Sequence, residues 1–257
     1  MMDRPMGAPV RSYRTSFQTD EDPISEGGIW LNGRTDGIDW ADVITRNGVV
    51  YGAVTRMAVA ERRAEQGNLD PAAANGAPEG DYDDPTAVLA GVWGPDQYAK
   101  AEMFSQNPTD EYFQEVEIRL RSTMEPHSCT GYEVFFRCLK TEDGYAEIVR
   151  WNGKIGDFTS LAKLTGPQYG VEDGDVIEAS IAGHVIKGYV NGVEMISATD
   201  DGFGQGSPGV GFNFFVGSTT SVCNTNSWRV IVCRNISMHA GCSPNVNLSV
   251  MVSSSTR

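Results

Sequence analysis

The feature that most constrains this chain is its recurring Asn-Gly and Asp-Gly pairs. Both central residues of a type I′ turn need positive φ, so such a pair between alternating apolar runs indicates a β-hairpin. The pairs begin at Asn32, Asn47, Asn75, Asn152 and Asn191, and at Asp36, Asp143, Asp173 and Asp201. Short alternating runs lie between them, as in residues 113–121 (FQEVEIRLR). This spacing predicts an all-β chain whose antiparallel strands form a sandwich.

Residues 174–214 show the pattern most clearly. Ile177, Ala179 and Ile181 alternate with polar or small residues, and a second run follows and ends at Asn191-Gly192. A Gly-rich loop then leads into residues 208–212 (PGVGF). We predict paired strands here, a hairpin turn at Asn191-Gly192 and a further strand after the loop.

Three segments of this stretch resemble the late strands of the concanavalin A-like lectin/glucanase superfamily, in its laminin-G-like form. They are residues 189–192 (YVNG), 199–200 (TD) and 206–212 (GSPGVGF). The resemblance implies a concanavalin A-like antiparallel β-sandwich, or jelly roll. The superfamily includes lectins, adhesion modules, hydrolases, lyases and structural domains, so the fold does not choose a function.

The chain divides into one predicted domain and two arms. We expect an N-terminal arm at residues 1–14, a β-sandwich at 15–242 and a C-terminal arm or added strand at 243–257. An insertion or loop at 57–85 is rich in Ala, Gly, Asp and Pro. Residues 246–250 (VNLSV) alternate like a short strand at the chain end, which suits an added edge strand or an exchange with a neighbour. The arms therefore predict a homo-oligomer.

Charge narrows the classes of partner. The formal net charge is −14 and the pI is about 4.6. Phosphate backbones and anionic membranes attract clustered Lys and Arg, so we predict neither a nucleic acid nor a membrane as partner. The polar start lacks the apolar segment of a signal peptide. We expect a cytoplasmic origin, with the virion surface or the extracellular space as later locations.

The cysteines allow one exclusion. Cys129 and Cys138 bracket a predicted strand, which would separate them by on the order of 30 Å at ~3.3 Å per residue. A disulfide needs Cα atoms within about 7 Å, so we predict that these two do not bond to each other. Pairing among Cys223, Cys233 and Cys242 remains open.

Glu115 and Glu117 are candidate catalytic residues. Glu115-Val116-Glu117 resembles part of the E-x-D-x-x-E signature of glucanases on this fold, where carboxylates on one strand act as nucleophile and general acid. The period of a strand places both glutamates on one face. The middle residue is not Asp, however, and the position of the second catalytic Glu is Leu120. We therefore predict no catalytic residue unless the chain is a hydrolase that uses this pair.

A lyase on this fold would need a base, usually His or Tyr, beside a group that neutralises charge. The histidines are His127, His184 and His239, and none has an obvious partner in the sequence. They give no support to a lyase site.

A glycan-binding face accounts better for the polar and aromatic residues of the predicted strands. Sugars are held by aromatic stacking together with directed polar groups. We predict that the ligand-binding residues are Arg119, Tyr132, Arg137, Arg150, Trp151 and Asn213.

A metal site has one candidate pair. Asp200 and Asp201 lie in a loop, and oxygen-rich loops bind calcium. No EF-hand spacing is present, so calcium is the candidate cation at this loop and no other cofactor is predicted.

Three functions follow from these patterns. The leading hypothesis is a non-catalytic binding and surface-display module for a glycan or a neighbouring protein, for example a virion decoration or tail-associated protein. The alternatives are a polysaccharide-cleaving enzyme, either hydrolase or lyase, and a purely structural assembly subunit.

Overall fold

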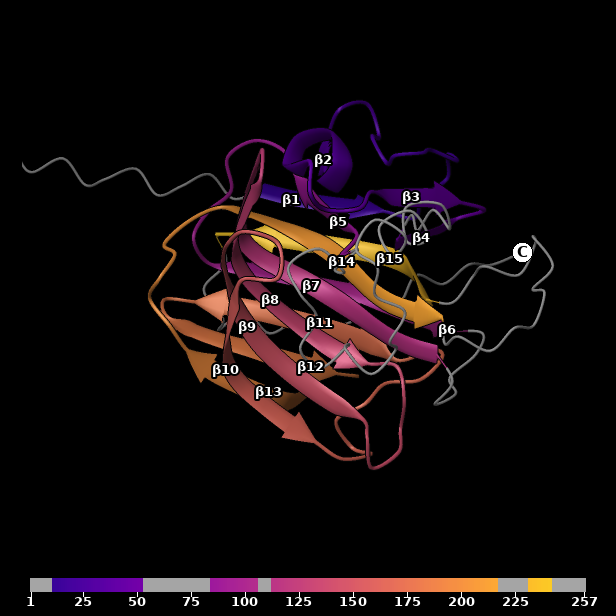
Figure 1. The fold of residues 1–257 in the computed structure, drawn as a ribbon, viewed down its shortest axis with the longest axis vertical. Helices are drawn as coiled ribbons and strands as arrows, with labels where there is room; N and C mark the ends of the chain where they lie inside the picture. The colour runs from indigo at the N-terminus through magenta and orange to yellow at the C-terminus, as the bar shows by residue number, and fades with distance from the viewer. Residues whose placement is uncertain (1–10, 53–83, 106–111, 217–230, 242–257) are drawn as a thin grey trace, which may run out of the picture.

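The computed structural model describes residues 11–52, 84–105, 112–216 and 231–241, which form two antiparallel β-sheets (Figure 1). The predicted all-β sandwich is confirmed. Among the described residues the only helical element is the π-helical turn η1 (Gly33–Gly37). None of the described helical segments has the length and apolar character needed to cross a membrane.

In the eight-stranded sheet, seven strands follow one another in a continuous order, and the eighth pairs with β15 outside that order. The order is β13 (Val193–Thr199), β12 (Val185–Val190), β11 (Val176–Ala182), β6 (Gln97–Ser105), β15 (Ile231–Ala240), β4 (Val49–Gly52) and β3 (Val43–Arg46), and β1 (Arg11–Thr15) also pairs with β15.

The seven-stranded sheet carries the residues that matter most below. Its order is β10 (Phe158–Thr165), β9 (Tyr145–Gly153), β8 (Ser128–Arg137), β7 (Tyr112–Glu125), β14 (Ser207–Val216), β5 (Thr86–Leu89) and β2 (Trp30–Asn32). In Figure 1 the central strands β7, β8 and β9 run side by side.

The main core lies between the two sheets because each contributes one apolar face. On β7 the inward residues are Val116, Ile118 and Leu120, each at most 1% exposed. Ile177, Ala179 and Ile181 of β11 meet them from the opposite sheet. Alternation therefore directs the charged residues of β7 away from this core.

Two hairpin turns follow the predicted Asn-Gly chemistry. Asn191 and Gly192 have φ of 52° and 78°, between β12 and β13. Asn47 and Gly48 have φ of 52° and 75°, between β3 and β4. These positive angles are those of a type I′ turn, so the prediction is confirmed at both sites.

Some predictions fall at the margins of the described residues. Residues 11–14, the end of the expected N-terminal arm, belong to β1 and pair with β15. Residues 57–83 and 243–257 lie outside the described ranges, so the insertion and the added strand stay predictions. Cys129 and Cys138 are both buried and share no disulfide, which confirms that they do not bond to each other.

Candidate functional site

The face of the seven-stranded sheet that points away from the core, called the outer face below, carries a dense set of ionisable groups. Alternation on β7 and the register of its neighbours bring these side chains together. Arg119 lies opposite Glu133, and Glu115 lies opposite Arg137. The outer face comprises Glu115, Glu117 and Arg119 of β7, Glu133 and Arg137 of β8, Tyr145, Glu147 and Trp151 of β9, and Lys163 of β10.

Arg119 is the centre of a buried ion-pair network on this face. Its Nη2 lies 2.8 Å from Asp84 Oδ2 and 2.9 Å from Glu133 Oε2. Trp151 Nε1 donates a hydrogen bond of 2.6 Å to the same Glu133 oxygen. The Arg119 guanidinium also lies over the Trp151 ring, 5.1 Å from its centroid. Because Arg119 is 1% exposed, its contacts with these groups replace contacts with water.

Gly211 makes room for the third carboxyl of the network. It lies opposite Glu117 on β14, and a Cβ there would come within 2.1 Å of Glu117 Oε2. That distance is far inside van der Waals contact. The second glycine of the PGVG segment is therefore required by a buried acid on the next strand.

Burial sets the protonation of these acids. It raises the pKa of Glu117 well above its usual value, and the negative charges of Asp84 and Glu133 raise it further. Burial also raises the pKa of Glu133 to about 7, although the neighbouring Arg119 charge opposes this rise. Burial and the neighbouring carboxylates therefore disfavour the ionised form of Glu117, whereas the Arg119 charge favours it.

The network has the spacing of a metal site but already contains a cation. Asp84, Glu117 and Glu133 offer oxygens within 4.8 Å of one another. Arg119 Nη2 lies within ion-pair distance of all three, the longest separation being 3.8 Å to Glu117. A divalent ion beside that guanidinium would be repelled by it. We assign these carboxyls to a structural ion-pair network.

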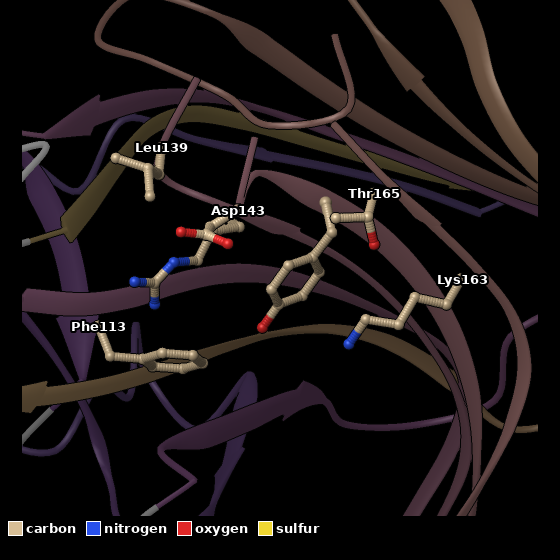
Figure 2. Close-up of a pocket in the computed structure, with 7 residues that line it drawn as sticks. Phe113, Leu139, Asp143, Lys163 and Thr165 are labelled. Atoms are coloured by element: carbon tan, nitrogen blue, oxygen red, sulfur yellow. The ribbon is translucent and has the colours of Figure 1, made fainter. Parts of the chain in front are cut away.

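A pocket opens beside this network, where β8, β9 and β10 meet. Its volume is about 360 Å³, and it is lined by Phe113, Arg137, Leu139, Asp143, Tyr145, Lys163 and Thr165. Figure 2 shows Phe113, Asp143 and Lys163 on different sides of this space. The Arg137 guanidinium lies 4.0 Å from the centroid of the Phe113 ring. The pocket thus combines aromatic surface with cationic and hydroxyl groups.

Tyr145 joins the pocket to Glu115. Its hydroxyl donates a hydrogen bond to Glu115 Oε1. Burial raises the pKa of Glu115 to about 8. Burial raises the pKa of Tyr145 above its usual value, and the adjacent Glu115 carboxyl, which accepts its hydrogen bond, raises it further. Both groups are therefore neutral at pH 7 and serve as hydrogen-bonding groups without charge.

Comparison with known proteins identifies the architecture. No family model and no curated protein sequence matches the chain. Bacillus licheniformis beta-glucanase matches with 12% identity and a TM-score of 0.50, covering 93% of this chain and 100% of that one. The protein has a concanavalin A-like fold.

Two further solved structures resemble this concanavalin A-like chain. One is reported for endo-acting O-glycanases that members of the human gut microbiota express to initiate mucin breakdown. It has 10% identity and a TM-score of 0.51, and the match covers 90% of this chain and 99% of that one. The Emp47p carbohydrate recognition domain has 10% identity and a TM-score of 0.47, with coverage of 90% and 95%. Likeness at these identities establishes the fold alone.

On this concanavalin A-like fold, β7 carries an incomplete version of the glucanase signature. Glu115 and Glu117 share the outer face, as the sequence predicts, and are 5% and 3% exposed. Leu120, at the position of the second catalytic Glu, is fully buried in the core.

The six predicted ligand-binding residues are divided among three environments. Arg119 and Trp151 face outward from the core but are 1% and 3% exposed, so their role in binding a ligand stays a prediction. Trp151 is buried because a second apolar cluster, which includes Trp40 and Met124, packs over it. Arg137 lines the pocket, and the half-buried Asn213 lies opposite Glu115 on β14.

Tyr132 and Arg150 belong to a different neighbourhood, with the calcium candidate Asp200. Tyr132 donates a 2.7 Å hydrogen bond to Asp200 Oδ1, and Arg150 Nη1 lies 2.6 Å from Asp200 Oδ2. Although partial burial opposes the change, bonds from Tyr132 and the Gly202 backbone and the Arg150 charge lower the pKa of Asp200. Asp200 is thus already matched by a cation. Asp201 instead lines a separate pocket of about 280 Å³.

The three histidines all lie away from the outer-face pocket. His127 is hydrogen-bonded to Asp39, His184 lines the second pocket beside Asp201, and His239 stacks on Tyr98. Tyr145 is the pocket residue closest to a lyase base in type, but its raised pKa makes it a poor base at neutral pH.

Sequence reasoning missed Asp84, Glu133, Tyr145 and Lys163. Glu133 and Tyr145 lie in the strands β8 and β9, so alternation along these runs is the signal that places them on the same face as Arg137. Asp84 had no such signal, because it contacts Arg119 from 35 positions away in the chain.

Proposed function

We propose that this protein is a non-catalytic glycan-binding module whose ligand occupies the pocket between β8, β9 and β10. The observation that carries the proposal is the pocket lining: the aromatic rings of Phe113 and Tyr145 lie beside the polar groups of Arg137, Lys163 and Thr165. Sugar rings stack on aromatic faces while their hydroxyls bind directed polar groups. At about 360 Å³ the pocket is near the lower end of the range for small-molecule sites, which suits a chain end.

The comparisons support this class of ligand. A beta-glucanase and an O-glycanase structure share the fold over most of the chain with TM-scores of 0.50 and 0.51. Both printed descriptions concern glycans. The pocket lies on one sheet face of that shared architecture, where paired strands present side chains in rows.

Burial of the carboxyls favours binding over hydrolysis. A retaining glycosidase holds two accessible carboxyl groups about 5–5.5 Å apart on either side of the scissile bond. Here Glu117 and Glu133 share the Arg119 network, and each is 3% exposed. Glu115 is hydrogen-bonded to Tyr145. Glu115, Glu117 and Glu133 are therefore already engaged with other groups in the described part of the chain, which disfavours their use as nucleophile and general acid.

A glycan array and a polysaccharide panel test the proposal, read for binding and also for turnover by reducing-end and 235-nm absorbance assays. Thr165→Trp should fill the pocket from its exposed rim and abolish binding. Thr159→Trp is the matched control, because it is exposed on the same strand but does not line the pocket. Equal glycan binding by both variants would show that the ligand does not occupy this pocket.

Turnover would replace the proposal with the enzyme alternative if Glu115→Gln or Glu117→Gln abolished it. Absence of both binding and turnover would argue against a glycan ligand altogether. A neighbouring protein as partner, and a virion decoration or tail-associated role, stay predictions that depend on terminal ranges outside the described residues.

A further inference from the structure

The pocket holds a buried cation with no counter-charge of its own. Arg137 is 7% exposed, and its Nη1 is buried without a hydrogen-bond partner. Within the part of the chain that the structure describes, no ion pair involves Arg137. The guanidinium lies over the face of the Phe113 ring. A buried guanidinium nitrogen without an acceptor is costly, so Nη1 favours an anion that enters the pocket.

None of the three acidic residues near Arg137 neutralises its charge. Glu115, directly across the strand pair, has a pKa raised to about 8 by burial and is protonated at neutral pH. The Glu147 carboxylate is 2.7 Å from Lys163 Nζ, so it neutralises a different cation. Asp143 also lines the pocket, but it is exposed and makes no ion pair with Arg137.

We propose that the ligand is an acidic sugar and that its carboxylate binds Arg137 inside the pocket. This inference rests on the proposed glycan-binding function and names its substrate class. The guanidinium presents donors in a fork that matches a carboxylate. One face of that guanidinium packs on the Phe113 ring. The Tyr145 ring and the Thr165 hydroxyl are then available to contact the rest of the sugar. The net charge of −14 does not exclude an anionic ligand, because the pocket lining contains two cations, Arg137 and Lys163, and only one anion, Asp143.

Calorimetry with matched oligosaccharides tests the inference. The probes end in glucuronate, in its methyl ester, in glucose or in glucose 6-sulfate, on one common neutral chain. The full-length protein should bind the glucuronate probe about 10- to 100-fold more tightly than the ester or the glucose probe, as expected for a charged hydrogen bond.

Two substitutions in the pocket should act in opposite directions. Arg137→Gln should remove the preference for glucuronate, and Asp143→Asn should strengthen it by lifting a competing negative charge. Asp143 is exposed, so its variant tests the idea even if Arg137→Gln fails to fold. Lys187→Gln, at a partly exposed position on the other sheet, is the control for the same loss of charge as Arg137→Gln.

The outcomes separate this inference from the proposed function. Equal binding of the acid, ester and neutral probes would overturn the acidic sugar and leave glycan binding intact. Binding of the sulfated probe alone would overturn the carboxylate. Failure of every probe, together with a silent glycan array, would overturn both proposals.

Discussion

Gly211 and Glu117 illustrate how one residue of β14 depends on a side chain of β7. Gly211→Ala should destabilise the protein by about 1–3 kcal/mol, because the new Cβ would lie 2.1 Å from Glu117 Oε2. Denaturant unfolding measures the change. Gly204→Ala is the control, since no atom lies within 4 Å of a Cβ at that position. Adding Glu117→Ala to Gly211→Ala should recover part of the lost stability. No recovery would show that a contact other than the one with Glu117 causes the destabilisation.

The buried acids make stability depend on pH. In the unfolded chain these glutamates ionise near the usual 4.5, whereas burial raises the pKa of Glu115 to about 8 and of Glu133 to about 7 in the folded chain. Between these values the native state binds more protons than the unfolded state. The free energy of unfolding should therefore fall from pH 5 to pH 9, by an amount on the order of a few kcal/mol.

Glu115→Gln should flatten that slope, because the amide stays neutral at every pH. Equilibrium unfolding at several pH values between 5 and 9 measures it, and Glu142→Gln, at an exposed position, is the control. A steeper slope in Glu115→Gln than in the parent would contradict the assignment of Glu115 as a buried neutral acid.

At the scale of elements, Arg121 ties β7 to three loops. Its Nε donates to the Pro95 carbonyl at 2.6 Å, and its terminal nitrogens donate to Phe203 at 2.9 Å and Gly183 at 2.8 Å. A lysine cannot reproduce this fork. Arg121→Lys should therefore lower stability by about 2–4 kcal/mol.

Hydrogen exchange locates the effect of Arg121→Lys. Residues 200–206 should exchange faster while the central strands remain protected. Arg46→Lys, which is half-exposed beside Asp22, should change neither stability nor exchange there. Unchanged exchange at 200–206 would mean that the loop is held by other contacts.

The Asn-Gly pairs differ in how well they predict where a strand ends. The Asn-Gly pairs at 47 and 191 predicted real hairpins because the turn is a local property. Asn152-Gly153 has the same letters but lies within the last residues of β9, and Asn32-Gly33 lies where β2 passes into η1. Pairing with distant strands overrides the local preference at these positions.

For the whole molecule, we predict that the C-terminal residues mediate assembly into an oligomer. Deletion of residues 243–257 should abolish any oligomer while the sandwich stays folded, because a strand added from a chain end joins neighbours without contributing to the core. Mass in solution and a thermal unfolding curve measure the two effects. An unchanged oligomer would argue against assembly through this arm.

The candidate site shows the limit of sequence reasoning at this scale. Arg137 was predicted to bind ligand and does line the pocket, but Arg119 and Trp151 had the same alternation and proved buried. Alternation reports which face a side chain occupies. It does not report what lies over that face, here the cluster with Trp40 and Met124.

The sequence by itself determined the all-β class, the two-residue hairpins and the division of β7 into an apolar and a charged face. These depend on φ preferences and on the period of a strand, which act over a few residues. Only the tertiary structure decided that Asp84, Glu117 and Glu133 meet around Arg119, and that Arg137 faces a pocket without a counter-ion. The physical reason is that strand register and the covering of a sheet face depend on contacts between residues far apart in the chain, which no local pattern encodes.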